Sequence, residues 1–162
     1  DMTRSRGLGD VYKRQVEAFS TDKYQYWPNA ERYGFSMIRD FNRGTVGWTD
    51  WNLLLDQTGG PNHVSNFCFA PIHGDTSTGE LIYTPTYYYI GHFSKFVGPD
   101  SVRISTSVSR NVVLATSFLN PDGTMATIVM NKSNDSINYS FFLNDRQVDL
   151  TIPPRAMQTL VY

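Results

Sequence analysis

The chain has 162 residues, which is room for one domain or for one domain and part of a second. Its 14 basic and 15 acidic side chains give a formal net charge of −1. This balance argues against a nucleic acid or a membrane surface as partner, because both favour a basic face. No apolar run approaches the roughly 20 residues needed to span a bilayer. The single cysteine, Cys68, excludes an internal disulfide framework, and its neighbours Phe67 and Phe69 indicate a buried thiol.

The first fifteen residues, "DMTRSRGLGDVYKRQ", are basic and show no apolar periodicity. They have two interpretations: a disordered basic arm, or an artefact, since "DVYKRQ" is similar to the in-frame translation of a transposon end used in sequencing-library preparation. We favour the artefact and exclude residues 1–15 from fold reasoning. Targeting information is then lost, so the localisation is unknown: both a secreted and a cytoplasmic location stay open.

The next segment predicts alternating helix and strand. Apolar residues from Ala30 to Phe41 recur at helical spacing after Pro28, and Gly44 supplies a left-handed stop. The stretch "TVGWTDW", 45–51, predicts a short strand because it is rich in β-branched and aromatic residues.

A long loop rich in glycine and proline is predicted over 52–85. Within it "IHGDTSTGELIYT" predicts a small hairpin that turns at 75–79, and a second helix follows over 86–95. The order helix, strand, loop, helix is typical of an α/β fold.

The second half changes to a period near two. Six segments alternate apolar and polar residues, which predicts an antiparallel β-sandwich that begins near residues 98–100. "NPDG" at 120–123 predicts a tight turn. The six predicted strands are "VRISTSVS", "VVLATSFLN", "TMATIVMNK", "INYSFFLN", "QVDLTI" and "MQTLVY".

The stretch from Thr45 to Phe67 concentrates indole rings and short polar side chains. If 45–51 is a barrel strand, its C-terminal end lies at the face where such enzymes place their chemistry. Trp48 and Trp51 are three residues apart and leave a strand on opposite faces, so Trp51 is the candidate at the mouth. An indole offers a flat surface for a pyranose, and nearby polar groups supply hydrogen bonds. Those groups are Asp50, Asn52, Asn62 and Asn66. The alternative is a tryptophan in the core beside ordinary turn residues.

A specific resemblance favours the sugar site. "VGWTDWNLLLDQTGGPNHVSNFCFAPI" closely resembles glycoside hydrolase family 30, the glucosylceramidase-like retaining β-glycosidases. The likeness continues through "YYYIGHFSKFVGPDSVRIS", "NPDGTMATIVMNKS" and "IPPRAMQTLVY", and covers 16–162. It implies a (β/α)8 TIM barrel with a β-sandwich beside it. By that likeness 16–98 form the last βα part of the barrel and 99–162 the sandwich.

The resemblance also implies site residues. The second tryptophan of "WTDWN" and the Asn-Phe pair after "GGPN" bind the glycone in the family, and here they are Trp51, Asn66 and Phe67. Asp50 stands where members keep an aspartate that we interpret as support for the site.

The reacting carboxyl groups are a separate question. A retaining glycosidase needs two carboxyl groups about 5–5.5 Å apart. The family takes its nucleophile from the end of the seventh strand and its acid/base from the fourth, which is absent here. Glu17 is either that nucleophile or a residue just after it. We favour the interpretation that it follows the nucleophile, so no catalytic residue is assigned. His63, His73 and His92 lack metal spacing and Cys68 has no partner cysteine, so neither a metal nor a cofactor is expected.

Two functions remain for the chain. The first is a fragment of a retaining β-glycoside hydrolase that contributes glycone contacts and is inactive alone. The second is a non-catalytic carbohydrate-binding or interaction module. One strand and two helices without the rest of a barrel should expose apolar surface, which favours the fragment. The identity of the sugar and of the aglycone depends on barrel loops that are not in the sequence.

Overall fold

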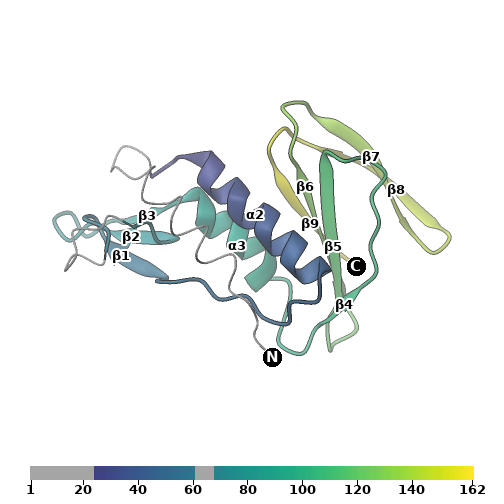
Figure 1. The fold of residues 1–162 in the computed structure, drawn as a ribbon, viewed down its shortest axis with the longest axis horizontal. Coiled ribbons are helices and arrows are strands. Elements are labelled where there is room, and N and C mark those ends of the chain that lie inside the picture. The colour runs from purple at the N-terminus through teal and green to yellow at the C-terminus, as the bar shows by residue number, and fades with distance from the viewer. Residues whose placement is uncertain (1–23, 61–67) are drawn as a thin grey trace. The chain divides into compact units, whose positions relative to one another are not determined.

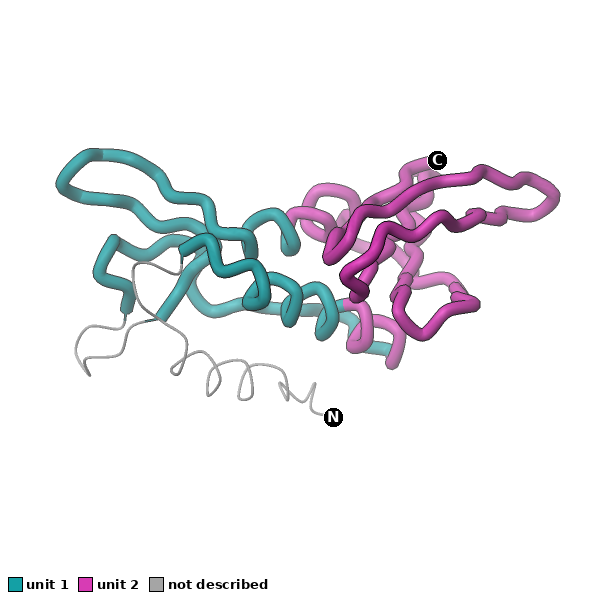
Figure 2. Tube along the Cα trace, turned by 90° about the horizontal axis from the view of Figure 1, so that it is seen from above, with its two compact units in different colours: residues 1–37, 44–90 teal, residues 38–43, 91–162 magenta. Residues whose placement is uncertain are grey.

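The computed structural model describes residues 24–60 and 68–162. Figure 1 shows the helices and strands along the chain. The chain divides into two compact units, shown in Figure 2. The first comprises Asp1–Met37 and Gly44–Ile90, and the second comprises Ile38–Arg43 and Gly91–Tyr162. The division therefore falls within each of the two described helices.

Helix α2 (Trp27–Asn42) follows the predicted apolar spacing. Ala30, Tyr33 and Met37 are buried along one stripe of the first unit. Pro28 lies in the first turn, where its missing N–H costs the helix nothing. Gly44 has a φ of +91°, a conformation that disfavours a side chain, and it follows the end of the helix as predicted. The predicted helix is confirmed.

Helix α3 (Pro85–Ser94) is the second predicted helix. In the first unit the ring of Trp27 at the start of α2 meets Tyr89 of α3 edge-on, with ring centroids 5.8 Å apart. The second unit holds the other ends of these helices, where Phe41 stacks on Phe93 at 5.6 Å. No helix in the part of the chain that the structure describes is long and apolar enough to cross a membrane.

A three-stranded sheet completes the first unit. Strands β1 (Leu54–Asp56) and β2 (Ile72–Gly74) run parallel, and β3 (Leu81–Tyr83) pairs antiparallel with β2. The hairpin between β2 and β3 turns at 75–79, where the N–H of Gly79 donates to the carbonyl of Asp75 at 2.7 Å. The predicted hairpin is therefore confirmed.

The predicted strand over 45–51 is wrong, because these residues form no strand. A strand is stable only when its backbone forms hydrogen bonds with a paired strand. The partner in a parallel pair comes from a segment that is distant in the sequence. The sheets of the described residues give 45–51 no such partner. The nearest strand is β1, inside the segment that the sequence predicts as loop.

All six predicted strands of the second half are present. Four of them form an antiparallel sheet in the order β4-β5-β6-β9, and β7 and β8 form an antiparallel pair. The first of the six is shorter than predicted, because the strand ends at Ile104. The strands are β4 (Val102–Ile104), β5 (Val113–Leu119), β6 (Met125–Asn131), β7 (Ile137–Leu143), β8 (Arg146–Ile152) and β9 (Met157–Val161).

The core of this second unit lies between its sheets. Alternating residues of the strands bring five buried apolar side chains into one cluster. The tight turn at 120–123 joins β5 to β6, with Gly123 N–H donating to the carbonyl of Asn120 at 3.0 Å. The buried cluster consists of Val113, Ala115, Val129, Ile137 and Ile152.

Candidate functional site

The two tryptophans after helix α2 have different surroundings. Trp48 is half-buried and meets the ring of Tyr33 edge-on, with centroids 5.6 Å apart. Trp51 keeps 63% of its surface exposed. One indole therefore packs against the helix and the other is open to solvent, although the stretch between them is not a strand. Trp51 is the one that can offer a flat face to a ligand.

Asp50 is held by helix α2 through one hydrogen bond. The hydroxyl of Tyr33 donates to Asp50 Oδ1 at 3.3 Å. Burial raises the pKa of Asp50, and the backbone N–H of Trp51 and the Tyr33 hydroxyl act in the opposite direction by favouring the charged form. The carboxylate thus serves as an acceptor that links a buried tyrosine to the start of the exposed segment.

The structure describes part of the predicted site. Asn66 and Phe67 lie outside the described residues, as does Glu17. Asn62 lies outside them too, whereas Asn52 is half-buried directly after Trp51. Asp50, Trp51 and Asn52 are therefore the residues of the predicted site that the structure describes, and they are consecutive in the chain.

A buried histidine is held by two backbone groups in the first unit. His73 has no exposed surface, and its Nε2 accepts a hydrogen bond from the N–H of Ala70 at 3.0 Å. Its Nδ1 lies 2.9 Å from the carbonyl oxygen of Asp56. Cys68, two residues before Ala70, is buried as predicted. Within 24–60 and 68–162 no three His, Cys, Asp or Glu side chains are grouped so that they could hold a metal ion.

The first unit also exposes apolar side chains on its sheet and around residues 46–54 of the sequence. Leu54 of β1 and Leu81 of β3 are each 55% exposed, and a Cβ at Gly74 between them would meet both at 3.9 Å. Leu53 and Val46 are more exposed still. The apolar exposure predicted for an α/β segment without its neighbours is therefore present on these residues.

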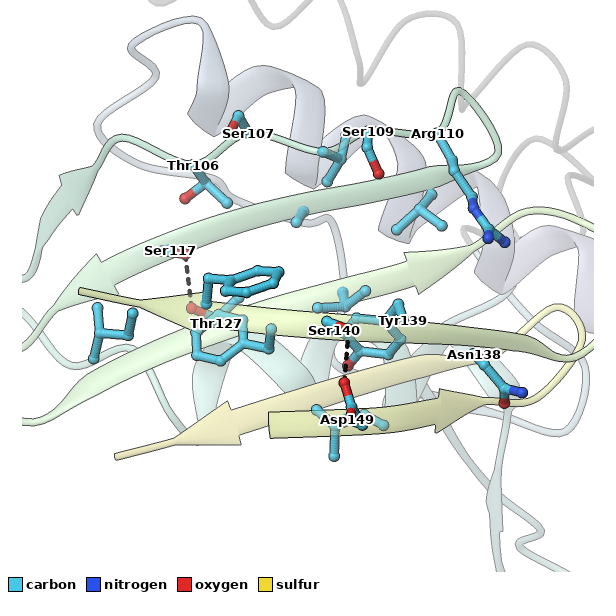
Figure 3. Close-up of a pocket in the computed structure, with 18 of the residues that line it drawn as sticks. Thr106, Ser107, Ser109, Arg110, Ser117, Thr127, Asn138, Tyr139, Ser140 and Asp149 are labelled. Carbon is cyan, nitrogen blue, oxygen red and sulfur yellow. Dashed lines mark hydrogen bonds between the residues drawn. The ribbon is translucent and has the colours of Figure 1, made fainter. Parts of the chain in front are cut away.

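A cleft of about 950 Å³ lies in the second unit (Figure 3). Its walls hold hydroxyl groups that bond to one another, such as Ser117 Oγ and Thr127 Oγ1 at 2.7 Å. Asp149 is the one carboxylate among the residues that line it, and it accepts a hydrogen bond from Ser140 Oγ at 2.6 Å. A retaining glycosidase needs a pair of carboxyl groups, so this cleft lacks the groups for that reaction.

Family comparison identifies the chain. The model of the glycosyl hydrolase family 30 TIM-barrel domain matches residues 13–97, and that of the family 30 beta sandwich domain matches 100–160. These two domains define an enzyme class, the glycoside hydrolases. The chain belongs to glycosyl hydrolase family 30, and its fold class is a piece of a TIM barrel followed by a β-sandwich.

Relatives within the family share the same stretch. The lysosomal acid glucosylceramidase of Mus musculus is 38% identical over 112 residues, which are 68% of this chain and 22% of that enzyme. The crystal structure of SrfJ from Salmonella typhimurium superposes with a TM-score of 0.82 at 34% identity, covering 84% of this chain and 31% of SrfJ. An endo-beta1,6-glucanase superposes with a TM-score of 0.67 at 28% identity, covering 75% of this chain and 28% of the glucanase. The chain thus spans less than a third of each of these proteins.

Sequence reasoning missed Tyr33 as a residue of the site, because Tyr33 fits the apolar stripe of α2. The signal for a second role was its hydroxyl group, since a buried tyrosine needs a hydrogen-bond partner.

Proposed function

We propose that this chain forms part of the glycone-binding wall of a retaining β-glycoside hydrolase similar to the glucosylceramidases. In this proposal the sugar stacks on the indole of Trp51, and Asp50 holds the backbone at that position. Asn66 and Phe67, assigned by resemblance, complete the wall with an amide and an apolar ring. Residues 16–98 belong to the barrel and 99–162 to the sandwich, a division supported by the ranges that the family models match.

The exposure of Trp51 is the observation that carries the proposal. The indole of Trp51 is 63% exposed, so it lacks the burial free energy that Trp48 gains by packing against Tyr33. The C–H face of a pyranose can cover such a ring, while the indole N–H can donate to a hydroxyl group. Membership of a family of glycoside hydrolases supplies the ligand class.

In this proposal the acid/base lies in a barrel segment outside the chain, and the nucleophile is either Glu17 or a residue just before it. Retention needs a nucleophile and an acid/base about 5–5.5 Å apart. Asp50 is a single carboxyl group and cannot fill both roles, and its hydrogen bond with the Tyr33 hydroxyl suits a supporting position. We therefore infer that the chain alone does not hydrolyse glycosides.

The test compares the isolated chain with a chimera. In the chimera, the part of this chain that matches the mouse lysosomal acid glucosylceramidase replaces its counterpart in that enzyme, and both the chimera and the isolated chain are assayed with a chromogenic β-glucoside. We expect turnover by the chimera and none by the chain alone. Turnover by the isolated chain would contradict the inference that it lacks a complete pair of catalytic carboxyl groups. Micromolar affinity of the isolated chain for glucose, measured by isothermal titration, would instead favour a non-catalytic carbohydrate-binding module.

A further inference from the structure

The side chain of Tyr33 connects helix α2 to the segment that carries the candidate sugar-stacking ring. Tyr33 is 4% exposed, and it lies 17 residues before Asp50 in the sequence. Its hydroxyl donates to Asp50 Oδ1 at 3.3 Å, so a buried donor and a partly buried carboxylate satisfy each other.

The same tyrosine makes a second contact with this segment. The ring of Trp48 meets the ring of Tyr33 edge-on at 5.6 Å. Tyr33 therefore holds residue 48 through its ring and residue 50 through its hydroxyl. Because 45–51 pair with no strand of the described sheets, side-chain contacts of this kind replace the ladder that would otherwise fix the backbone.

The link continues from Asp50 to Trp51. Trp51 follows Asp50 directly in the chain, so the backbone that Tyr33 holds at Asp50 is also the backbone that leads into Trp51. The indole of Trp51 is mostly exposed, so its direction depends on the backbone that bears it rather than on burial among neighbours. A change at Tyr33 can thus reach Trp51 through one carboxylate.

We propose that Tyr33 is a positioning residue, which holds the backbone that leads into Trp51 through Asp50 and so sets the position of the ring on which the sugar stacks. This inference rests on the proposed function, since it assigns Tyr33 a role in the same site. It predicts that removal of one hydroxyl group, without loss of the aromatic ring, alters both Asp50 and Trp51.

The first experiment uses the full chain and the variant Tyr33→Phe, which keeps the ring that packs on Trp48. The carboxyl carbon of Asp50 and the backbone amide of Trp51 are followed by NMR across a pH titration. Loss of a donor to the carboxylate should raise the pKa of Asp50 further and shift the Trp51 amide resonance. Tyr24→Phe is the matched control, because the Tyr24 hydroxyl donates to the carbonyl of Gln57 at 2.8 Å and should leave both signals unchanged. An Asp50 titration and a Trp51 amide that are the same in Tyr33→Phe as in the wild type would overturn the proposal.

A second pair of variants covers the case in which Tyr33→Phe does not fold. Asp50→Asn keeps a side-chain oxygen that can accept from Tyr33, whereas Asp50→Ala removes it. Hydrogen exchange of the Trp51 amide should be slower in Asp50→Asn than in Asp50→Ala, because only Asp50→Asn keeps the contact that holds the backbone. Equal exchange in these two variants would contradict the link through the carboxylate.

Kinetics in the chimera then separate this inference from the proposed function. Tyr33→Phe should raise KM for the β-glucoside about five- to tenfold with a smaller effect on kcat, because one hydrogen bond to a charged group is lost. If Trp51→Ala weakens the enzyme and Tyr33→Phe does not, the positioning role is wrong while the sugar site stands. If Trp51→Ala has no effect, the proposed function fails, and the NMR result still decides whether the link exists.

Discussion

His73 Nε2 accepts a hydrogen bond from the backbone N–H of Ala70 at 3.0 Å, inside the first unit of the chain. Since Nε2 is an acceptor, the proton of the neutral ring lies on Nδ1, which donates to the carbonyl of Asp56 at 2.9 Å. The ring also packs against Tyr24 at 4.7 Å and Phe69 at 5.7 Å. A second proton on this imidazole would turn its Nε2 into a donor that faces another donor.

The first prediction is that this histidine makes the chain less stable in mild acid. Burial lowers the pKa of His73, which outweighs the carbonyl and the carboxylate of Asp56 that favour the charged ring. Below the unfolded pKa of about 6.5 the unfolded chain therefore binds a proton before the folded chain does. The free energy of unfolding should be unaffected by His73 above that pH and should fall below it, by at most about 1.4 kcal/mol per pH unit.

Urea unfolding between pH 8 and pH 5, with NMR titration of the His73 ring, measures this effect. His92 is the second described histidine whose pKa burial lowers, so His92→Gln removes its share of the slope. A titration midpoint of His73 at or above 6.5 in the folded chain would rule out the predicted direction.

Asn131 carries the second prediction. Its side chain is fully buried, and Nδ2 donates to the carbonyls of Asp135 at 2.7 Å and of Pro153 at 2.9 Å, while Oδ1 accepts from the N–H of Ser133 at 2.9 Å. Asn131→Asp keeps the shape of the side chain but replaces the Nδ2 donor by a carboxylate oxygen, which faces the carbonyl oxygens of Asp135 and Pro153 and repels them. We expect a loss of about 3 kcal/mol or more in the free energy of unfolding.

Asn134→Asp is the control for this substitution. Asn134 is exposed and its Oδ1 only accepts a hydrogen bond, from Arg155 Nε at 2.9 Å, which an aspartate can also accept. Its effect should stay within about 0.5 kcal/mol. Urea unfolding at pH 7 compares the two, and equal losses would show that the donors of Asn131 are not what stabilises this region.

The third prediction concerns the turn between β5 and β6. Gly123 has a φ of +85°, so an added Cβ strains the backbone although no atom lies within 4 Å of it. Gly123→Ala should cost about 1 kcal/mol of stability. Gly98→Ala, at a glycine with equally open space and no positive φ, should be neutral or stabilising because it restricts the unfolded chain. Thermal unfolding that ranks Gly98→Ala as the more harmful of the two would contradict this explanation.

The strands of the second half could be predicted because the information is local. The alternation along 113–119 and 125–131 identifies each strand, and the NPDG turn at 120–123 sets the register between them. The segment 45–51 has the same local composition, and it forms no strand because a parallel strand needs partners elsewhere in the chain. The composition of a segment indicates whether its residues suit a strand, whereas pairing with another strand decides whether the strand forms.

The candidate site also has one feature that the sequence could predict and one that it could not. The exposure of Trp51 against the packing of Trp48 could be anticipated, since two indoles three residues apart leave an extended chain in different directions. The bond between Tyr33 and Asp50 could not, because it joins residues 17 positions apart across a helix end and a turn. The family resemblance names side chains that meet the sugar, and the structure is needed to find the side chains that hold them.

The central claim is that a sugar stacks on Trp51, and steady-state kinetics of the chimera with Trp51→Ala test it most directly. Tyr88→Ala serves as the control, because Tyr88 is an aromatic side chain of α3 that is 53% exposed. We expect Trp51→Ala to raise KM for the β-glucoside about tenfold, as loss of a stacking surface worth roughly 1–1.5 kcal/mol implies, and Tyr88→Ala to change little. Unchanged KM and kcat in Trp51→Ala would contradict the claim.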